Sequence, residues 1–165
     1  MRVYIPATLP MLQELVNDGY LQPRGGTAFA VTPTLREAYA EGDDEELAEI
    51  AIGEAAMASI RLLSADAGGG LPVRRGVGVA DAEKTTLRPD LDDAVVRISG
   101  RIAMDQVVAV YVDNADAEPA LKAAIEVIDE ADFGDEDAEL TVGDAQDRAM
   151  AWYATQEVPF LLDLL

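Results

Sequence analysis

The sequence predicts a single α+β domain, in which a mixed sheet of about five strands packs with helices on at least one face. Three observations predict this class: the chain length, the hydrophobic content, and the interleaving of strand and helix patterns. A chain of 165 residues fits one domain with a sizeable core, and half of its residues are hydrophobic. We therefore assign residues 1–165 to one domain.

A strand and a helix open the chain. Residues 2–6 alternate as a strand does, and Thr8 is a suitable N-cap for a helix that Gly19 would end. A second strand is expected at 27–32, and strand, helix and strand at this spacing favour a parallel pair with a right-handed crossover. Pro33 then begins a short helix.

The longest predicted element is a helix at 43–64. It begins in an acidic run at 43–46, where the helix dipole favours negative charge. Its apolar stripe contains many alanines, whose small size would allow a close approach to the sheet. The three glycines at 68–70 predict a loop within the domain, and the polar stretch 81–93 predicts a surface loop.

Three further strands are expected at 73–80, 94–101 and 106–113. The last is almost continuously apolar, which is typical of a central strand. A connection of about four residues joins 94–101 to 106–113 and permits antiparallel pairing between them. With the parallel pair above, the sheet is predicted to be mixed. A helix at 116–131 follows, with Pro119 in its first turn.

The C-terminal end is predicted as a helix at 141–158 followed by an apolar tail at 160–165. The chain has one tryptophan, three phenylalanines and five tyrosines, so Trp152 and Tyr153 are expected to be core anchors. Glu157 would lie at the negative end of the helix dipole, where a carboxylate is disfavoured. A residue in such a place is expected to have a partner or a function.

The charge limits the partners. There are 32 acidic and 12 basic residues, which gives a net charge of −20. A surface this negative repels nucleic-acid phosphates and anionic lipid, so we expect no direct nucleic-acid binding and no membrane binding. Solubility, adaptation to high salt, a basic protein partner, or mimicry of a nucleic acid each account for the acidity.

The chain contains no cysteine and no histidine. Disulfides, thiolate zinc sites, cysteine nucleophiles and Ser-His-Asp machinery are therefore excluded. No cofactor and no resident metal are expected. The start has no signal-peptide pattern and no apolar run reaches the ~18 residues of a membrane span, so a cytoplasmic location is expected.

Three hypotheses about function follow. The preferred one is a non-catalytic protein-interaction or regulatory module with a basic protein partner. The second is a carboxylate-dependent enzyme or small-ligand binder, with Mg²⁺ held by carboxylates, at the C-terminal ends of strands. Its candidate residues are Glu157 and Asp113 for catalysis, and Thr8, Thr32, Tyr153 and Gln156 for ligand binding. The third is mimicry of a nucleic acid, motivated by charge alone.

Segments at both ends of the chain also carry a resemblance. Residues 1–8 (MRVYIPAT), residues 27–33 (TAFAVTP) with the following Leu35-Arg36-Glu37, and residues 152–162 (WYATQEVPFLL) resemble a small family of uncharacterised proteins from high-GC Gram-positive bacteria. The resemblance implies that the whole chain is one domain of that family. It implies no activity, ligand or catalytic residue.

Overall fold

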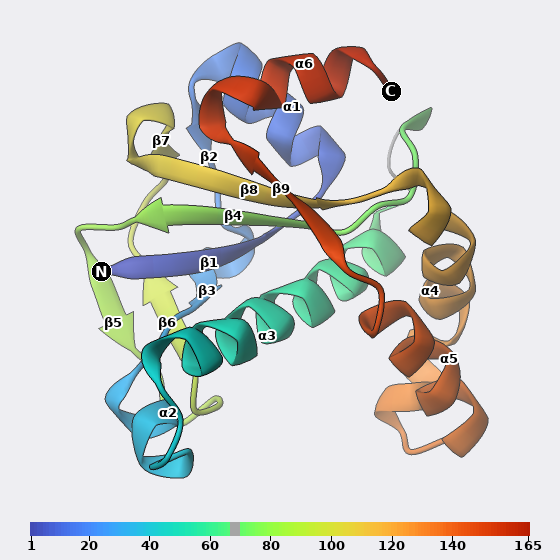
Figure 1. Cartoon of the computed structure of the whole chain (residues 1–165), viewed down its shortest axis with the longest axis horizontal. Helices are drawn as coiled ribbons and strands as arrows, with labels where there is room; N and C mark the ends of the chain where they lie inside the picture. Colours follow the sequence, from blue (N-terminus) through green and yellow to red (C-terminus); the bar gives the residue numbers. More distant parts are fainter. Residues whose placement is uncertain (67–69) are drawn as a thin grey trace.

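The computed structural model describes residues 1–66 and 70–165 and shows an α+β protein (Figure 1). In these residues the helices are α1 Leu9–Asp18, α2 Pro33–Ala38, α3 Asp44–Ala65, α4 Glu118–Asp132, α5 Glu136–Gln146 and α6 Val158–Asp163. The strands are β1 Arg2–Ala7, β2 Tyr20–Leu21, β3 Thr27–Phe29, β4 Gly76–Asp81, β5 Thr85–Leu87, β6 Val95–Ile98, β7 Ile102–Ala103, β8 Val107–Asp113 and β9 Met150–Ala154. Most of the predicted glycine loop, residues 68–69, lies outside the described residues.

The main sheet of the described residues has seven strands in the order β5-β6-β3-β1-β4-β8-β9. Every neighbouring pair in it is antiparallel. The α+β class is therefore confirmed, but the mixed sheet of about five strands is wrong. The short strand β5 lies in the segment 81–93 that was expected to be a loop, and β2 and β7 pair separately.

Two pairings in the predicted mixed sheet are wrong. After α1 the chain returns to the end of the sheet where β1 finishes, since residues 22–26 line the same cavity as Thr8. The strand β3 therefore begins at that end. The crossover therefore gives an antiparallel pair, with Tyr4 opposite Phe29. The strands β6 and β8 are not neighbours either: β6 pairs with β3 and β5, and β8 with β4 and β9.

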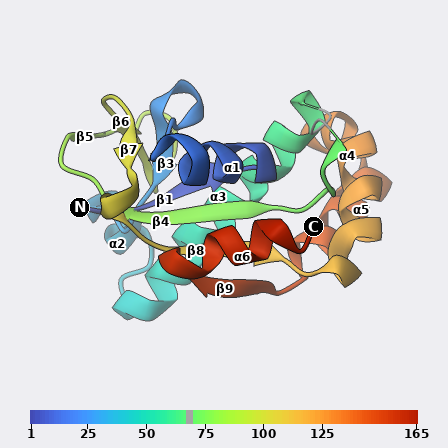
Figure 2. The ribbon, with the colours of Figure 1, turned by 90° about the horizontal axis from the view of Figure 1, so that it is seen from above.

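Helices cover both faces of the sheet (Figures 1 and 2). On one face α1 and α6 bury Leu12, Leu15 and Leu161 against the strands. On the other, α3 crosses the sheet with Ala51 and Ala55 fully buried, so its backbone approaches the strands closely. The end of α3 packs against α4 and α5, which form a hairpin beyond one end of the sheet.

The predicted starts of α1, α2 and α3 are confirmed, and each of these helices has a side-chain cap. The Met11 N–H donates to the Thr8 hydroxyl over 3.4 Å at the start of α1, and the Leu35 N–H donates to Thr32 over 3.0 Å at the start of α2. Asp43 accepts from the backbone of α3 in the same way. Each cap satisfies one of the backbone donors that a helix start leaves free.

The C-terminal segment differs most from the prediction. The helix expected at 141–158 is wrong: α5 starts at Glu136, after the cap Asp135, and residues 150–154 form the strand β9 instead. Trp152 is 57% exposed on this strand, so it is not a core anchor. The apolar tail forms α6, whose first turn contains Pro159. The adjacent aromatic residues of β9 favour a strand once β8 is available as its partner.

Candidate functional site

An open groove lies between α3 and β9 on the face of the sheet that α3 crosses. We call it the aromatic groove; its volume is about 460 Å³. Its floor is made by β1, β4 and β8, one wall by α3, and the other wall by Trp152. The lining residues are Arg2, Tyr4, Glu45, Ala48, Glu49, Ile52, Val79, Val108, Ala109, Tyr111 and Trp152.

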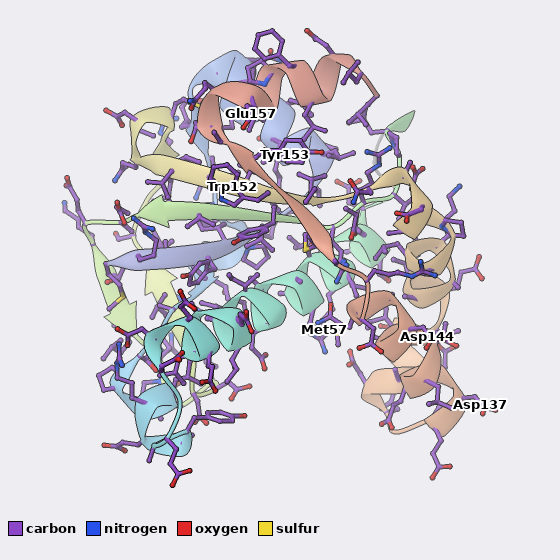
Figure 3. The ribbon with its side chains drawn as sticks, viewed as in Figure 1. Met57, Asp137, Asp144, Trp152, Tyr153 and Glu157 are labelled. Atoms are coloured by element: carbon purple, nitrogen blue, oxygen red, sulfur yellow. The ribbon has the colours of Figure 1, made fainter. Side chains whose placement is uncertain are left out.

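Strand register produces the hollow shape of this groove. Tyr111 lies directly opposite Trp152 across β8 and β9. In the next row Tyr4 faces Val79, and Val79 faces Ala109. Val79 and Ala109 have small side chains, so the sheet surface is lower there than at the rings of Tyr4, Tyr111 and Trp152. Figure 3 shows the Trp152 side chain over the strands of the sheet, on the side that α3 crosses.

Carboxylates form the opposite wall. Glu45 and Glu49 are four residues apart in α3, so both lie on the side of the helix that borders the groove. Within the part of the chain that the structure describes, neither of them forms an ion pair. The cation at the end of the groove, Arg2, is neutralised by Asp81 through contacts of 2.8 and 3.3 Å. The groove therefore combines exposed aromatic surface with unbalanced negative charge.

The phenol of Tyr4, on the floor of the groove, has a shifted pKa. Burial raises the pKa of Tyr4 above its ordinary value, Arg2 offsets part of this rise, and Tyr111 adds to it. Because the folded-state pKa is the higher one, the stability contributed by neutral Tyr4 is complete below the ordinary phenol pKa of about 10 and is lost as pH rises through the folded-state value. Absorbance at alkaline pH should show one late-titrating tyrosine that Tyr4→Phe removes. Removal of an early-titrating tyrosine instead would contradict this assignment.

The residues that the sequence singled out lie in other places. Thr8 and Thr32 are helix caps, and the Thr32 hydroxyl also donates to the Asp93 carbonyl oxygen. Thr8 additionally lines a polar cavity of about 550 Å³ with Arg24, and none of the other predicted site residues lines that cavity. Both hydroxyls therefore have structural partners.

Asp113 lies in a buried ion pair with Arg75, and both residues are 1% exposed. Its two carboxylate oxygens accept from the guanidinium over 2.9 and 2.7 Å, and one also accepts from the Arg75 N–H over 2.8 Å. The same guanidinium donates to the Gln146 side chain and to the Arg148 carbonyl oxygen. The Arg75–Asp113 pair thus joins the end of β8 to the residues that precede β4 and β9, and no solvent-exposed oxygen remains on Asp113.

The C-terminal candidates separate onto different surfaces. Tyr153 faces the side of the sheet covered by α1 and α6, opposite to Trp152 (Figure 3). Gln156 is exposed. Glu157 precedes α6 and its carboxylate accepts from the Ala154 N–H over 2.9 Å. The predicted conflict with a helix dipole therefore does not exist, because this carboxylate lies at the positive end of α6.

The groove residues were missed because their proximity depends on strand register. Trp152 was singled out by its rarity but was placed on a helix, which hid its pairing with Tyr111. The four-residue spacing of Glu45 and Glu49 was visible in the sequence. It was read as part of a helix start, because nothing local shows which surface α3 crosses.

The described residues also limit other kinds of site. Among residues 1–66 and 70–165, no group of three or more acidic side chains is arranged to hold a metal ion. No helix in the same residues is both long and apolar enough to cross a bilayer.

The described residues form an α+β protein with an open groove lined by aromatic and acidic side chains. The chain belongs to a family of unknown function, DUF6912, whose model matches residues 1–162. No curated protein sequence and no solved structure matches the chain.

Proposed function

We propose that this protein is a non-catalytic interaction module whose aromatic groove binds a basic segment of a partner protein. The observation that carries the proposal is the exposed Trp152 facing Glu45 and Glu49 across an open groove. Arginine and lysine side chains bind well between an aromatic face and carboxylates, through cation–π contact and charge-assisted hydrogen bonds. We further propose a cytoplasmic setting in a high-GC Gram-positive bacterium, which the resemblance of both chain ends supports.

The overall charge supports a basic partner. A net charge of −20 attracts a positively charged segment from a distance and speeds its association. It repels phosphate-rich partners at the same time. The attraction acts over the Debye length of about 10 Å at 0.1 M salt, so binding should weaken as salt is added.

A labelled peptide of alternating arginine and valine tests this function. We expect it to bind the wild-type protein, and Trp152→Ala to weaken binding at least about tenfold, as removal of a central aromatic anchor does. The double variant Glu45→Gln/Glu49→Gln should weaken binding by a similar factor and reduce its salt dependence. Fluorescence anisotropy at several salt concentrations measures all three.

Matched variants on the α4–α5 hairpin control for lost charge and lost aromatic surface. Phe133→Ala removes a ring that is 92% exposed, and Glu136→Gln/Glu139→Gln removes two carboxylates from the start of α5. Neither variant should change peptide binding by more than about twofold, because these residues do not line the groove and the two carboxylates act on the peptide only through a long-range field that salt screens. Equal losses from the hairpin variants and the groove variants would show non-specific attraction and would exclude the groove as the binding site.

A further inference from the structure

We infer that the basic partner segment binds as an extended strand, added to the free edge of β9. This inference rests on the proposed function of the aromatic groove and specifies how the groove is used. Strand addition is a common way to bind a peptide, because main-chain hydrogen bonds supply affinity and alternate side chains supply specificity. The edge of β9, its outward backbone groups and the position of Trp152 each support it.

Within residues 1–66 and 70–165, no second strand pairs with the outer edge of β9. β9 is the last strand in the sheet order, with β8 as its hydrogen-bonded neighbour, and none of its residues 150–154 is buried. Exposed edges are usually protected by a charged side chain or a proline. The β9 sequence MAWYA has neither. This edge is therefore available for pairing.

The hydrogen bond of Glu157 shows which backbone groups face outward. The Ala154 N–H donates to the Glu157 carboxylate, so it points away from β8. In an antiparallel pair, residues alternate between bonding their partner and facing away from it. Trp152, two residues earlier and opposite Tyr111, therefore also directs its N–H and C=O outward. The carboxylate occupies the Ala154 donor, which ends the available edge there and leaves Met150 and Trp152 for the partner.

The same register aligns an added strand with the groove. The Trp152 side chain lies on the groove face, so alternate side chains of the added strand point to that face beside it. Such side chains recur about every 6.6 to 6.8 Å. Basic residues at alternate positions would therefore contact Trp152 and be attracted by the negative charges of Glu45 and Glu49. A second copy of this chain is the less favoured occupant, because each copy carries a net charge of −20.

N-methylation of the alternating arginine–valine peptide tests strand addition. One peptide is methylated on the backbone nitrogens of its arginines, and another on the backbone nitrogens of its valines. Only one of these two sets of N–H groups can face β9, so we expect one peptide to bind at least about tenfold more weakly and the other to keep its affinity within about threefold. Hydrogen exchange should also slow at the Trp152 amide when the unmethylated peptide binds, and Trp152→Phe should retain this protection.

Three results would overturn the inference. If both methylated peptides bind equally while Trp152→Ala still weakens binding, strand addition is wrong and the proposed function stands. If the unmethylated peptide does not bind the wild-type protein, both the inference and the proposed function are wrong. If the Trp152 amide is already protected in a peptide-free dimer detected by sedimentation, a second copy occupies the edge.

Discussion

Replacing Asp113 by alanine should lower the free energy of unfolding by about 3–5 kcal/mol, the loss typical of a buried ion pair that loses one partner. The side chains of Arg75 and Asp113 are 2% and 0% exposed, so water cannot solvate the guanidinium that remains. Three hydrogen bonds of 2.7 to 2.9 Å to the carboxylate disappear together. Urea unfolding monitored by circular dichroism measures the change.

Two comparisons separate burial from charge. Asp132→Ala breaks a similar arginine–aspartate pair with Arg61, but both side chains are about half exposed, and the loss should be about 1 kcal/mol or less. The double variant Arg75→Met/Asp113→Leu should recover much of the stability that Asp113→Ala loses, because it leaves no unpaired charge. If Asp113→Ala is no worse than Asp132→Ala, the ion pair does not hold this part of the fold together.

The buried ion pair also bears on the groove. The Arg75 guanidinium donates to the Arg148 carbonyl oxygen over 2.7 Å, and Arg148 lies two residues before β9. The Gln146 side chain links the same guanidinium to the Gly53 carbonyl oxygen of α3. The two walls of the aromatic groove, α3 and β9, are therefore connected through one buried cation. Asp113, which the sequence suggested as a catalytic candidate, is thus the partner of the cation that connects these two walls.

Local signals in the sequence predicted local structure well. Thr8 caps the helix that it was expected to cap, Pro33 begins α2 as expected, and α3 spans almost the predicted residues. A cap depends on a hydroxyl or carboxylate and on backbone donors within three residues, so the nearby sequence contains the necessary information. The α+β class followed from the same kind of signal, summed over the chain.

Strand pairing could not be predicted, because it depends on residues far apart in the chain. Tyr4 and Trp152 line the same groove although they lie near opposite ends of the chain. Their meeting requires the order β1-β4-β8-β9 and the register of each pair. Because residues 150–154 form a strand, Glu157 lies at the start of α6 and not at the end of a helix, so it does not violate the dipole rule.

Ser59→Ala should lower the free energy of unfolding by about 2–4 kcal/mol, since each buried backbone group left without a partner costs roughly 1–3 kcal/mol. Ser59 is fully buried in α3, and its hydroxyl donates to the Ala7 carbonyl oxygen over 2.7 Å. It also accepts from the Gly76 N–H over 3.1 Å. Ala7 and Gly76 face each other at the end of the β1–β4 pair, so one hydroxyl joins α3 to two strands.

Ser64→Ala is the matched control, because it makes the same chemical change in the same helix. Ser64 is exposed, and its hydroxyl forms one long hydrogen bond, of 3.4 Å, to the Ile125 carbonyl oxygen. The loss of stability should therefore stay within about 0.5 kcal/mol. The gain in helix propensity from alanine is common to both variants and cancels in their difference. Chemical unfolding of the two variants under one condition gives that difference directly. If it is zero, the Ala7 and Gly76 backbone groups find other partners, and α3 is held over the sheet by apolar packing alone.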